Sequence, residues 1–345
     1  MRTHARYTML GLALATASLL IPSSAHGDVP VWPDLSAPPA TAPDGAKDAA
    51  LVIAIENYFV VPKVPGAVRN GTDWYSWLVD GRKVPVDRVT LLRNEQGSRE
   101  EILKRAADAA KGVQPGGTLW VVFIGHGAPS QDASEGVLVG VDAQQTPESL
   151  YARSVRQSEL ASAIGAGTPT VMVLDACFSG RASRGQPIAA GLQPLLAVRS
   201  VAMAGASLLT AGQSNEFAGP LPGVDRPAFS YLVLGALRGW GDANGDGVVT
   251  AREAVDYARK ALTVLPTGRS QTPQLVSAQP EQPLASHVAE RGPNLAGIVS
   301  GASVARPAVA APEVPLAVAQ APAPAAPRPG GRMVRIPAGK YTIGQ

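Results

Sequence analysis

Two stretches of the sequence decide the fold, LWVVFIGHG at positions 119–127 and VMVLDACFSG at positions 171–180. Each begins as a continuous apolar run, which is typical of a buried strand in a parallel sheet. His126 follows the first run, and Cys177, the one cysteine of the chain, follows the second. A cysteine nucleophile needs a base to form its thiolate, and a neighbouring strand end can supply that base. The pair therefore points to acyl transfer through a thioester.

Apolar runs and helical spacing alternate on both sides of these two stretches. Further strands are expected at 51–55, 89–92 and 207–211. Helices are expected at 66–79, 98–111, 158–164, 229–237 and 251–262. This alternation predicts an α/β domain with a mostly parallel sheet. Because such sheets bind ligands at the carboxyl ends of their strands, we expect His126 and Cys177 to meet there.

The two ends of the chain differ in composition from this central part. A positive start, an apolar run and small residues up to Ala25 predict a secretion signal over 1–25, with an uncleaved N-terminal anchor as the alternative. The expected location is periplasmic or extracellular, with no stable membrane span after cleavage. Residues 26–48 are predicted to be a Pro/Ala-rich linker, 49–290 the folded domain and 291–331 a disordered Ala/Pro-rich linker.

Charge and cysteine content narrow the class of protein. The net charge of the 345 residues is only +3, and no long basic stretch points to nucleic acid. A lone cysteine in an exported protein cannot form an internal disulfide, so Cys177 is either a buried inert thiol or a reactive one. Its position beside Ser179 and Gly180 favours a thiol that is not deeply buried. The sequence does not indicate an oligomeric state.

The runs FIGHG and LDACFSG resemble the caspase-like cysteine peptidases, especially their bacterial and metacaspase branch, and the resemblance covers about 49–283. It implies a six-stranded, mostly parallel sheet flanked by helices, and a peptide or protein substrate. It also implies that Cys177 is the nucleophile and His126 the general base and acid. The backbone N–H groups of Gly127 and Cys177 would form the oxyanion hole. No organic cofactor is expected.

Asp175 and Ile124 concern the substrate pocket in this resemblance. In metacaspase-like relatives the acid at the position of Asp175 binds Arg or Lys of the substrate, so cleavage after a basic residue is expected. The alternative is that Asp175 only caps loop N–H groups. Ile124 stands where metacaspases commonly carry a small hydroxyl residue. An obstructed pocket there would make the chain a caspase-fold pseudoenzyme that binds a partner, which is the alternative function.

A calcium loop is predicted inside the same domain. Residues 242–253, DANGDGVVTARE, fit the twelve-residue EF-hand pattern, with Gly247 at the sharp turn. The expected oxygen ligands are Asp242, Asn244, Asp246, Val248 through its carbonyl, Thr250 and Glu253. The predicted role of the Ca²⁺ is structural, and the alternative is an Asx-rich turn between helices that binds no metal.

The last residues, 332–345, are predicted to be the start of a possible truncated second domain. The run MVRIPAGKYTIG at 333–344 resembles the opening of formylglycine-generating, sulfatase-modifying domains. Because only this short stretch matches, no activity is inferred from it.

Overall fold

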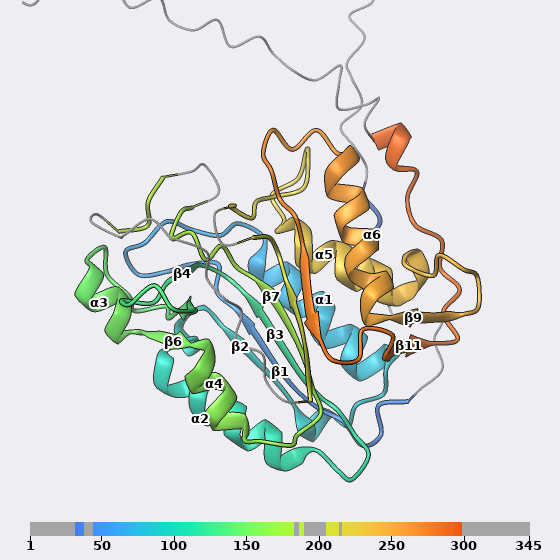
Figure 1. Ribbon diagram of the computed structural model, residues 1–345, viewed down its shortest axis with the longest axis horizontal. Helices are drawn as coiled ribbons and strands as arrows, with labels where there is room; N and C mark the ends of the chain where they lie inside the picture. The colour runs from blue at the N-terminus through green and yellow to red at the C-terminus, as the bar shows by residue number, and fades with distance from the viewer. Residues whose placement is uncertain (1–31, 38–43, 183–185, 190–204, 214–215, 299–345) are drawn as a thin grey trace, which may run out of the picture. The chain divides into compact units, whose positions relative to one another are not determined.

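The computed structural model describes residues 32–37, 44–182, 186–189, 205–213 and 216–298 (Figure 1). In chain order the strands are β1 Ala49–Ala54, β2 Val89–Arg93, β3 Leu119–Ile124, β4 Gly127–Pro129, β5 Gly136–Val139, β6 Ser154–Arg156, β7 Thr170–Asp175, β8 Ala206–Thr210, β9 Val248–Thr250, β10 Gln274–Ser277 and β11 Pro283–Ser286. The helices are α1 Ala67–Ser76, α2 Arg99–Gly112, α3 Pro147–Ala152, α4 Gln157–Ile164, α5 Ala228–Gly235 and α6 Ala251–Val264.

Six strands form the central sheet in the order β10-β8-β7-β3-β1-β2. Every neighbouring pair is parallel except β8 and β10, which run antiparallel. The predicted mostly parallel six-stranded sheet is therefore confirmed. Strands β3 and β7 lie side by side at its centre, so the two reactive stretches are neighbours in the sheet.

Helices cover both faces of the sheet, with α1, α5 and α6 on one face and α2 and α4 on the other (Figure 1). Alternate residues of each central strand point to opposite faces. In β3, Val122 and Ile124 pack on the first face, while Val121 and Phe123 pack on the second. Both faces are buried, which explains why these strands are apolar without a break.

Side-chain caps fix the first turns of helices α2 and α6. The Ser98 hydroxyl accepts the N–H of Glu101 at the start of α2. At the start of α6 the Thr250 hydroxyl accepts the N–H of Glu253, and the Glu253 carboxylate accepts the N–H of Thr250. Such a reciprocal pair satisfies two helix N–H groups that have no partner within the helix.

The structure differs from the sequence expectation for part of the predicted N-terminal linker. Residues 32–37 lie along α5, where Leu35 is buried and the Trp32 indole donates to the Pro222 carbonyl. The Tyr231 hydroxyl donates to the Pro33 carbonyl at 2.6 Å. A run rich in proline has no periodic pattern, so its few large side chains were not recognised as core residues. The folded part of the chain thus includes residues ahead of position 49.

The predicted signal at 1–25 and the predicted second-domain start at 332–345 lie outside the described residues, as does most of the 291–331 linker. Within the described ranges, no helix is both long and apolar enough to cross a membrane.

Candidate active site at the ends of β3 and β7

Register brings the two reactive residues to the same edge of the sheet. Ile124 of β3 pairs with Asp175 of β7, and the Gly125 N–H donates to the Asp175 carbonyl at 3.2 Å. His126 and Cys177 each follow two residues after this pair. Parallel pairing therefore sets them level on adjacent strand ends, as the sequence predicted.

His126 is buried, and its ring is held by two contacts. Its Nε2 lies 2.7 Å from the carbonyl oxygen of Pro62, in the segment that follows β1. The ring packs against Tyr58, with 4.9 Å between ring centroids, and the Tyr58 hydroxyl accepts the backbone N–H of His126. Burial lowers the pKa of His126 to about 4, although the Pro62 carbonyl opposes this shift.

The Pro62 contact also determines which ring nitrogen of His126 is free to accept a proton. A carbonyl oxygen can only accept a hydrogen bond, so Nε2 carries the proton. In the neutral ring, Nδ1 then bears the lone pair. The lowered pKa keeps the ring neutral at neutral pH, so the Nδ1 lone pair is free to accept a proton, but the same shift makes the ring a weaker base than an exposed histidine.

Cys177 is more deeply buried than the sequence suggested, with 8% of its surface exposed. Among the described residues, Sγ hydrogen-bonds with the backbone of Ala218 alone. The Ala218 N–H donates to the sulfur, and the thiol donates to the Ala218 carbonyl oxygen at 3.3 Å. Burial raises the pKa of the Cys177 thiol to about 12. The expectation of a partly exposed thiol was wrong because the loop around Ala218 covers the strand end.

Gly127 lies directly against the segment that carries Cys177. A Cβ on Gly127 would stand 2.9 Å from the Cys177 carbonyl oxygen and 3.1 Å from the Ala176 Cβ, so only glycine fits here without a shift. The Phe178 ring lies over Gly127 and over Gly136 on the paired strand β5. The β4–β5 hairpin and the cysteine segment therefore pack as one unit.

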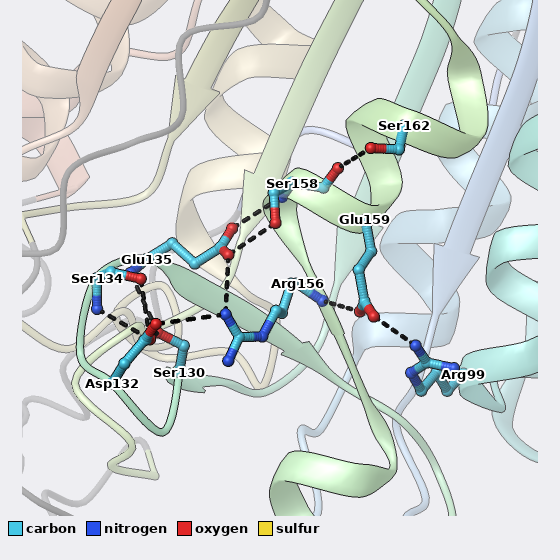
Figure 2. A network of polar contacts seen from close by, with 9 residues as sticks. All are labelled: Arg99, Ser130, Asp132, Ser134, Glu135, Arg156, Ser158, Glu159 and Ser162. Atoms are coloured by element: carbon cyan, nitrogen blue, oxygen red, sulfur yellow. Dashed lines mark hydrogen bonds and ion pairs between the residues drawn. The ribbon is translucent and has the colours of Figure 1, made fainter.

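A polar network ties this hairpin to α4 (Figure 2). The buried Glu135, at the start of β5, accepts the N–H and the hydroxyl of Ser158 at 2.8 and 2.7 Å. Arg156 forms ion pairs with Glu135 and with Asp132 at the hairpin turn. Because its carboxylate is satisfied by three donors, Glu135 fixes the hairpin relative to the helix layer.

A cavity of about 420 Å³ opens between the two strand ends, and His126, Asp175 and Cys177 all line it. Residues 218–220, Asp225 and Pro227 form another wall. Ile124 is absent from the lining because its side chain is fully buried in the core beneath the sheet. Ile124 therefore does not obstruct this cavity, contrary to the concern that the sequence raised.

The position of Asp175 is compatible with both roles that the sequence left open. It lines the cavity, and its Oδ2 accepts the N–H of Ser230 in the first turn of α5 at 2.7 Å. A carboxylate at a helix N-terminus is favourable because it faces unpaired N–H groups. Burial raises the pKa of Asp175, while the hydrogen bonds from Ser230 and the charge of Arg269 act against that shift.

Three residues of this site were not recognised in the sequence, namely Tyr58, Pro62 and Ala218. Pro62 and Ala218 act through backbone atoms, which almost any residue type supplies, so the sequence could not single them out. Tyr58 lies shortly after β1. A tyrosine at the end of a buried strand was the one sequence signal that could have placed it at the site.

The predicted calcium loop forms a tight turn before β9. Asp242 accepts the N–H groups of Gly245, Asp246 and Gly247, and both glycines have positive φ. The Glu253 carboxylate accepts the N–H and hydroxyl of Thr250. No group of three acidic, histidine or cysteine side chains is arranged to hold a metal within the described residues. The loop has the predicted ligand types and turn, and Oε2 of Glu253 is engaged by Thr250.

Comparison with known proteins places this chain in a family. Solved structures that resemble the chain include protein GSU0716 from Geobacter sulfurreducens, with TM-score 0.48, 16% identity and coverage of 70% of this chain and 100% of that one. Caspase-1 from Spodoptera frugiperda has TM-score 0.44 and 15% identity, with 72% and 93% covered. A search of curated proteins gives no match. The family model described as the caspase domain matches residues 47–284, so this chain belongs to the caspase-domain family of cysteine-type peptidases.

Proposed function

We propose that this chain is a cysteine endopeptidase that acts through a thioester acyl-enzyme formed on Cys177. The observation that supports this most strongly is the shared register of β3 and β7, which sets His126 and Cys177 level at the wall of one cavity. The orientation of His126 adds to it, since the Pro62 carbonyl leaves Nδ1 as the free base. The Asp-Ala-Cys run relates the chain to the bacterial and metacaspase branch of the family.

The proposed reaction proceeds in two halves. Nδ1 of His126 takes the thiol proton as Sγ of Cys177 attacks the scissile carbonyl carbon, and the carbonyl electrons move to its oxygen. The N–H groups of Gly127 and Cys177 donate to this oxyanion. His126 returns the proton to the leaving amine as the C–N bond breaks. Water, deprotonated by His126, then attacks the thioester, and the sulfur leaves and regains its proton.

Asp175 is the proposed selector of a basic residue before the scissile bond. It faces the cavity beside Cys177, and a buried carboxylate binds a guanidinium or ammonium group through short, charge-assisted bonds. Because Asp175 also accepts the Ser230 N–H, one of its oxygens is fixed and the carboxylate is held in place.

A fluorogenic peptide panel with Arg, Lys or Asp before the scissile bond tests both proposals. We expect hydrolysis after Arg and Lys, and a preference of at least about tenfold over Asp, because an aspartate would face the Asp175 charge. Asp175→Asn should keep the Ser230 bond and lose most of the basic preference. If no peptide is cleaved by protein with a native melting profile, the partner-binding pseudoenzyme becomes the better account.

We also propose that residues 242–253 bind Ca²⁺ as a structural element. The ligands would be the side chains of Asp242, Asn244, Asp246, Thr250 and Glu253 and the Val248 carbonyl. The loop joins elements that are distant in sequence, because β9 pairs with β11 and the Gly247 carbonyl accepts the Val288 N–H. Calcium would supply a charge that offsets the carboxylates gathered in this turn and would fix these elements together.

Thermal melting with and without Ca²⁺ tests this proposal. We expect a saturable rise in the melting temperature with added Ca²⁺, because an ion that binds only the folded state stabilises it. Glu253→Gln should abolish the rise. Arg252→Gln, which changes a neighbouring exposed residue outside the ligand set, is the matched control and should preserve it. An unchanged midpoint at millimolar Ca²⁺ would rule out the metal role.

A further inference from the structure

The segment of residues 216–220, here called the thiol loop, lies against the sulfur of Cys177. Ala218, at its centre, is both donor and acceptor to Sγ. None of the hydrogen bonds found in the described part of the chain joins Sγ to His126, whose Nε2 contacts Pro62. The nucleophile and the base thus line one cavity but are bonded to different backbone segments.

The first residue of the thiol loop is fastened to the segment ahead of β10. The Glu216 carboxylate accepts the N–H of Thr272 at 2.7 Å and its hydroxyl at 2.8 Å. It also accepts the N–H of Gln213 at 3.0 Å. Three donors on one carboxylate make a strong and directional attachment. Glu216 lies two residues from Ala218, so this attachment determines where Ala218 can lie.

A second attachment supports the other end of the thiol loop. The Arg269 guanidinium lies under Gly219, where a Cβ would stand 2.7 Å from Cζ, and its Nη2 donates to the Pro220 carbonyl at 2.9 Å. Gln271 accepts from Nε and Nη2 of Arg269 and from the Gly219 N–H. The thiol loop is therefore held by hydrogen bonds on both sides of Ala218.

We propose that the thiol loop is a latch that keeps the Cys177 thiol bonded to Ala218 and away from His126, and that Glu216 is the positioning residue that holds it closed. The peptidase consequence rests on the proposed function, whereas the latch itself concerns only the accessibility of one sulfur. Opening the latch requires breaking the Glu216 attachment to Thr272. Ala218, Gly219 and Pro220 also form one wall of the cavity, so a peptide that enters it contacts the latch directly.

The lone cysteine makes the latch measurable without a substrate. Cys177 is the one thiol that iodoacetamide can alkylate in the full-length chain, and the rate of that reaction follows the thiolate fraction and the exposure of the sulfur. We expect slow alkylation of the wild type and a rate at least about tenfold higher for Glu216→Ala, since three charge-assisted bonds are lost. Glu216→Gln keeps one acceptor oxygen and should fall between them. Thr272→Val, which removes one bond and no charge, should give a smaller increase.

The pH profile separates an opened latch from general loosening. In the wild type the rate should keep rising up to about pH 10 without a plateau, because burial raises the thiol pKa. In Glu216→Ala the profile should shift to lower pH as water reaches the sulfur. Glu281→Ala removes an exposed carboxylate paired with Arg252, and should leave both rate and profile unchanged.

Alkylation rates within about twofold of the wild type for Glu216→Ala and Thr272→Val, in protein that melts cooperatively, would overturn the latch. If Glu216→Ala fails to fold, Thr272→Val decides alone. Faster alkylation in a protein that cleaves no peptide would support the latch and reject the peptidase. Unchanged alkylation in an active peptidase would do the reverse.

Discussion

At the scale of single residues, the most informative group is the His126 imidazole, because one backbone carbonyl determines which of its nitrogens carries the proton. Pro62 holds the Nε2 proton, and burial keeps the ring neutral. The sequence predicted His126 and Cys177 from residue type and position. It did not predict the thiol environment, because the covering contact comes from the backbone of Ala218, where any residue but proline supplies the same two atoms.

His126 should make the protein less stable in acid. Its pKa is about 4 in the folded state and about 6.5 in an unfolded chain, so the unfolded state binds more protons below pH 6.5. Stability from this group is fully present above that pH and is lost as the pH falls towards 4. Urea unfolding at pH 7 and pH 4 should show that wild type loses about 3 kcal/mol more than His126→Gln. Equal losses would show that His126 titrates normally in the folded protein.

At the scale of elements, the longer apolar strands were predictable and the shortest strands were not. The runs that became β1, β3, β7 and β8 were recognised because both of their faces are buried, and the partly buried edge strand β2 was recognised from its apolar residues. The small sheet of β4, β5 and β6 was missed, since its strands have only three or four residues each. Yet this sheet carries Gly127, and its position depends on the Phe178 ring and the Glu135 network rather than on local propensity.

The contact between Phe178 and Gly136 can be tested by enlarging one side chain and shrinking the other. In Gly136→Ala the new Cβ would stand 2.3 Å from Phe178 Cδ1, so the ring must move. We expect a loss of about 1–3 kcal/mol of unfolding free energy, as is usual for overpacking. Phe178→Leu in the same chain should recover part of that loss, because the smaller side chain makes room. Additive losses in the double variant would show that the ring and Gly136 do not interact.

At the scale of the whole molecule, the sheet order explains why the site forms where it does. His126 and Cys177 are distant in sequence, and only the central pairing of β3 with β7 brings them to one edge. The loops that finish the site come from distant parts of the chain, with Pro62 following β1 and Ala218 following β8. Sequence patterns predicted the sheet and brought His126 and Cys177 to its edge, while the loops around the cavity depend on tertiary packing that no local pattern records.

The central claim is that Cys177 and His126 act together on a peptide bond. Its most direct test is the initial rate of hydrolysis of an arginyl fluorogenic peptide by wild type, Cys177→Ala and His126→Ala, each checked for a native melting profile. The account predicts that the wild type cleaves the peptide and that each variant loses at least about a thousandfold in rate. Cleavage that persists in Cys177→Ala would contradict it.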